Sequence, residues 1–490
     1  MNNIFEKIRF WIRGVLLEFA RKLKTERSKD IAVRTPNNLF AKEIKVPVFV
    51  SLICTFVVIY GMFIIDFGMS YKAMIATAIF TTASIIFFIA QLQSEEKTIL
   101  KDNDAVVLMC LFFITAILTF QIAKEYVSPF VSPVAAFVLM AAMLLSPRIG
   151  ILYAVCLSLS IAFLNDMRFD IFLVMLCSSI VVLTNAKHIR RRADFINSGL
   201  KVAVANTVIM LMFYFFDTYN ITQFRSNLLY GVLNGAFVII ILLVSMPLFE
   251  RVFSRTTNIK LIELSDFNNT LLKRLMIEAP GTYHHSLMAA DIAEQAANMI
   301  NDNSLLARVG SYYHDIGKLN NPHYFIENQT SGDNPHDELT PTLSSLILLS
   351  HVKDGVVLAK KYNVDDEIIN IIEQHHGTTP MHSFYHRALE VSPDADIEIF
   401  RYPGPKPTTK IAAIVMMADA CEAACRSIDE PNAARIKDIV EKIINNKFID
   451  GQFSDCPVTL KDLETIRDSI ISTIIGIYHA RIEYKEEEQK

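Results

Sequence analysis

The chain has 490 residues, 52% of them hydrophobic and 20% charged, and its 47 Lys and Arg against 51 Asp and Glu leave a formal net charge of −4. This composition excludes a disordered or collagen-like protein, and the small negative charge offers no bulk basicity for binding a nucleic-acid polymer. Long apolar runs occur only in the first half, whereas the second half reads as ordinary soluble sequence. We therefore predict a membrane protein with a soluble domain that follows the membrane part.

The N-terminal 45 residues are charged, so no cleavable signal peptide is expected before the first long apolar run, which begins near Val46. Within residues 1–45, the stretch 4–24 carries apolar side chains at helical spacing with Lys and Arg between them. This pattern predicts an amphipathic helix in an N-terminal cytoplasmic segment. Such a helix could lie on the membrane surface or pack on the soluble domain, and the sequence does not separate the two.

Eight segments between residues 46 and 250 come close to the roughly 20 apolar residues that a membrane-spanning helix needs. They are 46–66, 72–92, 105–123, 129–146, 149–165, 170–186, 199–215 and 228–249. The two on either side of Pro147 could instead form one re-entrant hairpin. Basic residues gather in alternate loops, most densely at Lys187–Arg192, and an even number of spans puts both termini on that side. By the positive-inside rule, both termini of this multi-pass protein are predicted to be cytoplasmic.

Residues 251–277 have helical periodicity with no Pro or Gly, which predicts a helical connector behind the last span. In residues 278–490, amphipathic helices of about 10–20 residues follow one another, with almost no alternation of the kind that strands show. Short polar clusters such as Asn320–His336 and Ser392–Thr409 separate them. The predicted fold class is therefore all-α, with a polytopic helical membrane domain followed by an all-helical cytoplasmic domain.

Eleven of the twelve histidines lie between His284 and His479, a clustering that packing alone does not explain. They include the runs His284-His285, His314-Asp315 and His375-His376, as well as His351. Imidazole and carboxylate groups are the ligands of hydrolytic transition-metal pairs. Asp419 follows Ile411 and Val415 at steps of four, so this carboxylate shares an apolar stripe and needs a neutralising partner such as a metal. A single histidine is more often a surface or core residue, but the combination indicates a metal site.

The order of His, then His-Asp, then Asp, with further histidines between, resembles the HD phosphohydrolase superfamily. The resemblance is closer to the seven-transmembrane HD family, whose members are bacterial membrane phosphodiesterases of the PgpH type that hydrolyse cyclic di-AMP. The similar stretches are His314–Lys318, Phe325–Gln329, His375–Thr378, Arg401–Pro407 and Gly476–His479, of which the last is the least specific. The resemblance therefore implies an HD domain in the soluble half.

The same resemblance implies two divalent transition-metal ions per chain, iron or manganese. One metal would be held by His285, His314, Asp315 and Asp419, and the other by Asp315, His351, His375 and His376, with Asp315 as the bridge. All seven positions carry the expected residue type, which argues against a degenerate pseudo-enzyme. The implied partners are a cyclic dinucleotide substrate and the lipid bilayer, and a homodimer is left open.

A metal pair of this kind makes water acidic enough to supply hydroxide for attack on phosphorus, in line with the 3′-oxygen that leaves. Cyclic di-AMP would thereby be opened to linear pApA. Lys318 lies four residues after His314, on the same face if the helix continues, and could contact a phosphate oxygen. The alternative for Lys318 is a solvated lysine at a helix C-terminus. Lys406 in the Pro-rich loop is a second candidate for substrate binding.

Three other functions compete with this interpretation. A cyclic di-GMP phosphodiesterase of the HD-GYP type would carry Gly-Tyr-Pro after the histidine pair, whereas this chain has Gly377-Thr378-Thr379-Pro380. Another nucleotide phosphohydrolase of the superfamily would use the same ligands. A membrane receptor could bind a nucleotide without turnover.

The chain also has only about five residues, 67–71, where the family usually carries an extracytoplasmic domain.

Overall fold

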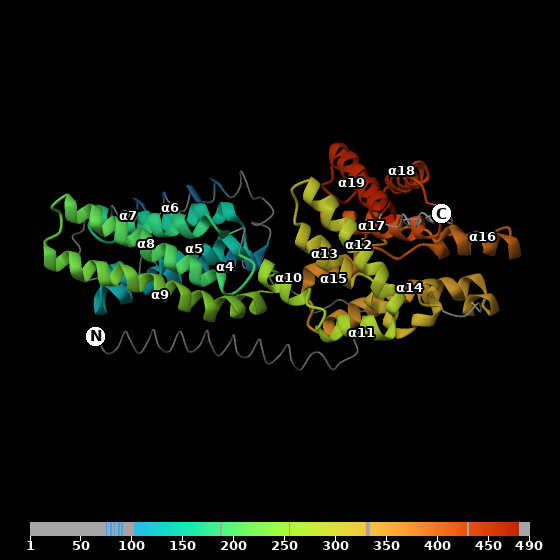
Figure 1. The fold of residues 1–490 in the computed structure, drawn as a ribbon, viewed down its shortest axis with the longest axis horizontal. Helices are drawn as coiled ribbons and strands as arrows, with labels where there is room; N and C mark the ends of the chain where they lie inside the picture. Colours follow the sequence, from blue (N-terminus) through green and yellow to red (C-terminus); the bar gives the residue numbers. More distant parts are fainter. Residues whose placement is uncertain are drawn as a thin grey trace, which may run out of the picture. The chain divides into compact units, whose positions relative to one another are not determined.

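The computed structural model describes residues 102–186, 189–253, 255–329, 334–428 and 431–479, together with single residues between 75 and 91. The predicted amphipathic segment and first span lie outside these residues, as does most of the second span. In the described part every regular element is a helix, and the nearest approach to a strand is one isolated bridge between Pro380 and Arg401. The all-α prediction is confirmed there (Figure 1).

The apolar half is a group of helices that run alongside one another (Figure 1). They are α4 (Asn103–Tyr126), α5 (Val134–Leu144), α6 (Pro147–Phe163), α7 (Phe169–Leu183), α8 (Asp194–Phe215) and α9 (Ile221–Val252). Each of the six predicted segments from residue 105 onward overlaps one of them. Helices α4, α8 and α9 are long and apolar enough to cross a membrane, whereas α5, α6 and α7 have only 11, 17 and 15 residues.

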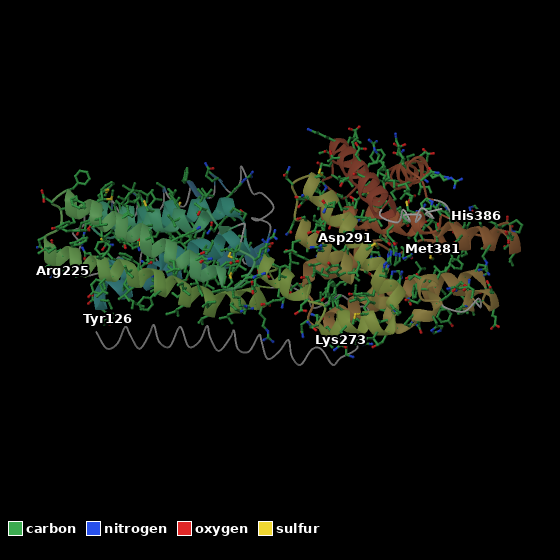
Figure 2. The ribbon with its side chains drawn as sticks, in the orientation of Figure 1. Tyr126, Arg225, Lys273, Asp291, Met381 and His386 are labelled. Atoms are coloured by element: carbon green, nitrogen blue, oxygen red, sulfur yellow. The ribbon has the colours of Figure 1, made fainter. Side chains whose placement is uncertain are left out.

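The predicted span 129–146 is divided, because it begins with the short 3-10 helix η2 (Pro129–Val131) before α5. The break leaves backbone carbonyls that an apolar environment does not satisfy. Asn234 of α9 donates its amide to the carbonyls of Phe130 and Ser132, at 3.0 and 2.7 Å. Tyr126, the last residue of α4, and Arg225, near the start of α9, lie toward the same end of this helix group (Figure 2).

The connector 251–277 is helical, but it is made of separate helices. Helix α9 ends at Val252, and two short helices follow, α10 (Asn258–Leu264) and α11 (Thr270–Glu278). Thr257 and Asn269 begin them by accepting hydrogen bonds from backbone N–H groups of the first turn. A helix can therefore restart without Pro or Gly wherever a capping side chain is present. Both short helices contribute leucines to the core of the soluble half.

The soluble half contains α12 (Pro280–Met299), α13 (Ser304–Tyr313), α14 (Pro341–Lys361), α15 (Asp366–Gln374), α16 (His382–Val391), α17 (Lys410–Arg426), α18 (Ala433–Ile449) and α19 (Leu460–His479). Short 3-10 helices join them, namely η4 (Ile316–Asn320), η5 (Pro322–Tyr324), η6 (Ile326–Asn328), η7 (Pro335–Glu338) and η8 (Ile397–Phe400). Helix α17 is surrounded by α12, α13, α15, α18 and α19. Helix α14 also has the length and composition of a membrane span, yet it packs on η4, α15 and α16 within this core.

Candidate metal centre

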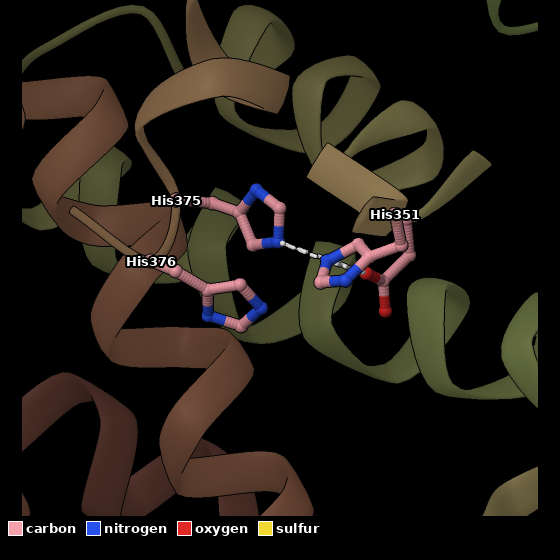
Figure 3. A group of neighbouring side chains, drawn as sticks. His351, His375 and His376 are labelled. Atoms are coloured by element: carbon pink, nitrogen blue, oxygen red, sulfur yellow. Dashed lines mark hydrogen bonds and ion pairs between the residues drawn. The ribbon is translucent and has the colours of Figure 1, made fainter. Parts of the chain in front are cut away.

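Seven side chains from separate segments converge in the soluble half. They fall into two groups whose potential ligand atoms lie within 4.8 Å of one another, one formed by Asp315, His351, His375 and His376 and the other by His285, His314 and Asp419. Figure 3 shows three imidazoles of the first group turned toward a common space. The structure thus brings together all seven residues that the resemblance assigned to two metals, with Asp315 grouped with His351, His375 and His376.

Asp315 lies between the two groups at the start of η4. Its Oδ1 atom is 3.4 Å from Nε2 of His351 and 3.6 Å from Nε2 of His375. Its Oδ2 atom is 3.2 Å from Nε2 of His314 and 3.6 Å from Nε2 of His285. Each carboxylate oxygen therefore faces one group, which is the arrangement that a bridging ligand requires.

Three of the imidazoles are oriented by their own helices. Nδ1 of His314 contacts the carbonyl of Ser311 at 2.7 Å, and Nδ1 of His375 contacts that of Ile372 at 2.8 Å. His351 makes the same contact with the carbonyl three residues before it. A carbonyl can only accept, so each of these rings carries a proton on Nδ1 and directs its Nε2 atom toward Asp315.

His285 of α12 is oriented differently, because both of its ring nitrogens face α17. Its Nε2 atom lies 3.0 Å from Oδ1 of Asp419, and its Nδ1 atom hydrogen-bonds Oε2 of Glu422. Glu422 was missed by the sequence analysis. Its position three residues after Asp419 on one helix was the signal available, since such residues share a face.

The charges of this cluster depend on one another. Burial alone would raise the pKa of the Asp315 carboxyl, but His314 and Lys318 beside it hold that pKa well below its usual value. Burial lowers the pKa of His351, which favours its neutral form. Among the described residues, Nε2 of His314 and Oδ1 of Asp315 are buried without a hydrogen-bond partner. Buried imidazole and carboxylate groups directed at one space are a donor set that fits divalent cations.

Lys318 does not follow His314 on a continuing helix. Helix α13 ends at Tyr313 and the chain continues as the 3-10 helix η4. The side chain of Lys318 is only 13% exposed, with Nζ at 2.7 Å from Oδ2 of Asp315 and 2.7 Å from Oε1 of Glu327. The alternative of a solvated lysine is therefore wrong, and Glu327 is a partner that the sequence analysis missed within a run it had noted.

The open side of the cluster lies at His376, whose side chain is 22% exposed, whereas the other six are at most 10% exposed. Tyr402 stacks on the His376 ring, with centroids 4.1 Å apart. Lys406 lies in the same Pro-rich loop, but its Nζ atom donates to the carbonyl of Gly451 at 2.9 Å. The structure therefore ties Lys406 to the turn after α18.

Comparison with known proteins gives matches along both halves. Residues 71–257 match the family described as 7TM receptor with intracellular HD hydrolase, and residues 282–424 match the HD domain family. Cyclic-di-AMP phosphodiesterase PgpH of Listeria monocytogenes is 37% identical over 434 residues, which cover 86% of this chain and 60% of that protein. PgpH of Bacillus subtilis is 41% identical over 367 residues, which cover 73% of this chain and 52% of that protein.

A solved structure of the L. monocytogenes PgpH HD domain in complex with cyclic di-AMP is also similar. It is 50% identical, covers 44% of this chain and 100% of that domain, and aligns with a TM-score of 0.43. The chain spans between about half and 60% of the length of the curated relatives it matches.

Proposed function

The chain belongs to the seven-transmembrane HD family of the HD superfamily, and we propose from this premise that it is a membrane-anchored phosphodiesterase that hydrolyses cyclic di-AMP to linear pApA. Two relatives that together match most of the chain carry this activity in their names. The observation that carries the proposal is the position of Asp315, with one carboxylate oxygen toward each group of imidazoles. A two-metal phosphodiesterase needs a ligand that reaches both metals.

HD domains bind divalent metal ions, and the donor set described above fits two of them. We propose that His285, His314, Asp315 and Asp419 hold one ion and that Asp315, His351, His375 and His376 hold the other, with iron or manganese as the metals. When bound, such a pair lowers the pKa of water enough to supply hydroxide at neutral pH and stabilises charge on the phosphoryl oxygens. The protein contributes the orientation of each ligand.

The chain's own residues shape how a substrate would approach. The partial exposure of His376 makes its side of the cluster the entrance, and Tyr402 stacked on that ring narrows it. Lys318 neutralises Asp315 from the buried side and would remain there beside Glu327. Contact of Lys318 or Lys406 with a substrate phosphate remains a prediction, since in the structure both ammonium groups already have protein acceptors.

The proposal is tested by incubating the purified full chain with cyclic di-AMP and, in parallel, with cyclic di-GMP, while the metal content of the same sample is determined. We expect pApA from cyclic di-AMP, slower or no hydrolysis of cyclic di-GMP, and loss of both after chelation. Faster hydrolysis of cyclic di-GMP would contradict the substrate. A folded protein with two metals that binds cyclic di-AMP without turnover would instead be a receptor.

A further inference from the structure

We infer that Glu422 is a positioning residue that holds His285 in the form that binds a cation, and that it stabilises one of the two proposed metal positions more than the other. The inference rests on the proposed metal centre but not on the identity of the substrate. The juxtaposition that carries it is a buried carboxylate on the outer nitrogen of His285, on the side away from the cluster.

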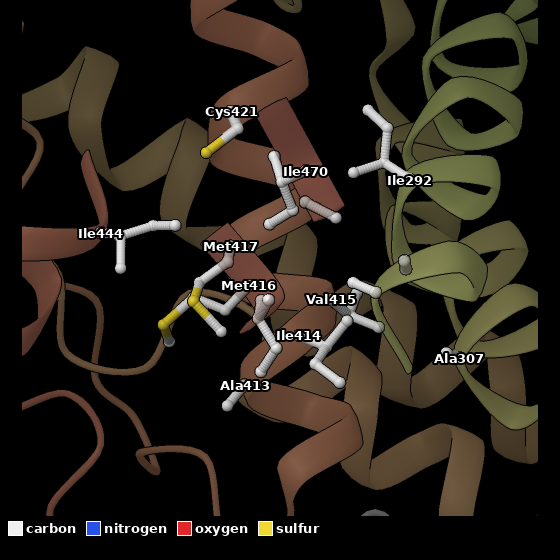
Figure 4. Close-up of a cluster of buried hydrophobic side chains, with 14 of the residues drawn as sticks. Ile292, Ala307, Ala413, Ile414, Val415, Met416, Met417, Cys421, Ile444 and Ile470 are labelled. Carbon is white, nitrogen blue, oxygen red and sulfur yellow. The ribbon is translucent and has the colours of Figure 1, made fainter. Parts of the chain in front are cut away.

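The geometry places two carboxylates of one helix around one imidazole. Asp419 and Glu422 lie three residues apart on α17, and both are 7% exposed. Asp419 faces Nε2 of His285 at 3.0 Å, and Glu422 hydrogen-bonds Nδ1. Helix α17 has little freedom to move, since apolar residues pack around it (Figure 4). Glu422 therefore accepts the Nδ1 proton of His285, while Nε2 faces Asp419 and the cluster.

Glu422 differs in kind from the groups that orient the other buried imidazoles. His314, His351 and His375 each contact a neutral backbone carbonyl through Nδ1. A hydrogen bond to an ionised acceptor is roughly twice as strong as one between neutral groups, and it makes the opposite nitrogen a better metal ligand. His285 should therefore be the imidazole whose basicity depends on a side chain.

The negative charge of Glu422 should also increase the cation affinity of the metal position that includes His285. Asp315 and Asp419 offset only half of the charge of two divalent cations when the imidazoles are neutral. Glu422 adds a negative charge directly behind His285, and Arg426 offsets it only in part, at 3.4 Å from Oε1 and with its own side chain 37% exposed. Cation affinity at the position formed by His285, His314 and Asp419 should depend on this charge more than affinity at the other position does.

The choice of substitution follows from the surroundings. Glu422 also borders a small cavity with His284, Arg426 and Tyr478. A shorter side chain would therefore admit water, which could replace the lost acceptor at Nδ1 of His285. Glu422→Gln keeps the size and an oxygen that accepts the Nδ1 proton, and removes only the charge. Glu422→Ala removes the acceptor as well. Glu441→Gln on α18 is the matched control, because that carboxylate pairs only loosely with Lys437, at 4.0 Å.

The experiment titrates Mn²⁺ into the metal-free full chain and measures bound metal per chain, with circular dichroism of each variant. We expect two Mn²⁺ in the parent and in Glu441→Gln. In Glu422→Gln the Mn²⁺ affinity of one position should fall about tenfold, and in Glu422→Ala it should fall toward about a hundredfold. This is the range of effects for residues that hydrogen-bond a metal ligand. At an intermediate Mn²⁺ concentration these variants should hold close to one ion per chain with parental helical content.

Several results would overturn the inference. Two Mn²⁺ bound with parental affinity by a folded Glu422→Gln protein would show that the carboxylate does not act on the centre. Equal weakening of both positions would contradict the selectivity for one of them. If Glu422→Ala fails to fold, the Gln variant alone decides. A parent that binds two Mn²⁺ but leaves cyclic di-AMP intact would overturn the proposed function and leave this inference standing.

Discussion

Charged side chains in the cluster are buried, so each of them depends on its neighbours for compensation of its charge. Asp315 is 1% exposed and lies among imidazoles and the Lys318 ammonium, which replace the water that a free carboxylate would have. Removing one partner from such a buried set leaves the others uncompensated, at a cost of several kcal/mol. Single substitutions here should therefore lower the metal content of the cluster. The helices should persist, because their packing depends on apolar faces outside the cluster.

Asp315→Ala is the substitution expected to have the largest effect. It removes a ligand from both proposed metal positions and the negative charge that offsets two close cations. We expect metal content below two per chain and turnover reduced more than about 100-fold, which exceeds the effect of an outer partner. Metal analysis and a rate assay on the same preparation measure this.

Two comparisons make the Asp315 result specific. His376→Ala should impair mainly one position, because that imidazole belongs to one group only. Asp291→Ala on α12 (Figure 2) is the control for loss of a carboxylate, since the Asp291 side chain is half exposed and pairs weakly with Arg308 at 3.6 Å. An Asp315→Ala protein with two metals and near-parental rates would refute the bridging role.

The backbones of η4 and α14 approach each other closely at Gly317. A Cβ atom on Gly317 would lie 1.8 Å from the carbonyl oxygen of His351 and 2.5 Å from the backbone nitrogen of Gly355. Backbone atoms cannot rotate away as a side chain can, so this contact needs glycine. The same approach brings Asp315, two residues earlier, against His351. The Gly in the His314–Lys318 run therefore has a structural reason within the site.

Gly317→Ala and Gly476→Ala form a matched pair that tests this reason. Gly317→Ala should lower the free energy of unfolding by about 3 kcal/mol or more, because the backbone must separate. Gly476 lies within α19, and beyond the adjoining backbone no described atom lies within 4 Å of an added Cβ, so Gly476→Ala should stabilise by about 0.5–1 kcal/mol. Urea unfolding of residues 258–490 measures both. A Gly317→Ala protein as stable as the parent would contradict the close approach.

At the scale of the whole molecule, α10 and α11 belong energetically to the soluble half although they follow directly on the last apolar helix. Leu261, Leu264, Leu271 and Leu275 are buried in one core with residues of α13 and α15. The hydroxyl of Tyr313 also donates to the carbonyl of Leu264 at 2.7 Å. A soluble fragment that starts after α11 would expose this apolar surface to water.

Fragments 258–490 and 278–490 should therefore behave differently. The longer one keeps α10, α11 and all seven proposed ligands, so we expect it to fold, bind metal and hydrolyse cyclic dinucleotide. The shorter one loses these four buried leucines and Leu272, each contributing about 1.5–3 kcal/mol, which should leave it aggregated or without a cooperative transition. Expression, helical spectra and melting curves measure the difference. Equal folding of both would mean that the connector contributes nothing to the core.

The membrane half gives a prediction of topology from the alternation of basic loops. Cysteine labelling should find positions near Lys24, Lys187 and Lys490 accessible from the cytoplasm and position Asn220 accessible from outside. The labels are compared in intact and in opened cells, with the parent as control. Accessibility of Asn220 and the C-terminus from the same side would refute the eight-span arrangement.

The amino-acid sequence by itself determined the helical class and the positions of six apolar helices, because the length and period of apolar runs are local properties. It also indicated which residue types meet at the cluster, since the His and Asp positions match a family pattern. It did not indicate the break in the connector, because capping by Thr257 and Asn269 leaves no Pro or Gly signal. Helix restarts of this kind are visible only once the caps are seen in place.

Only the tertiary structure decided which groups each charge faces. Asp315 and His351 are 36 residues apart, and His285 and Glu422 are 137 apart, yet both pairs are in contact. Their distances depend on how α12, α14 and α17 pack, which is a property of the whole core and not of any local pattern. The position of Lys318 between Asp315 and Glu327 has the same origin, because the 3-10 helix η4 packs against α14 and a continuing helix would not place the side chain there.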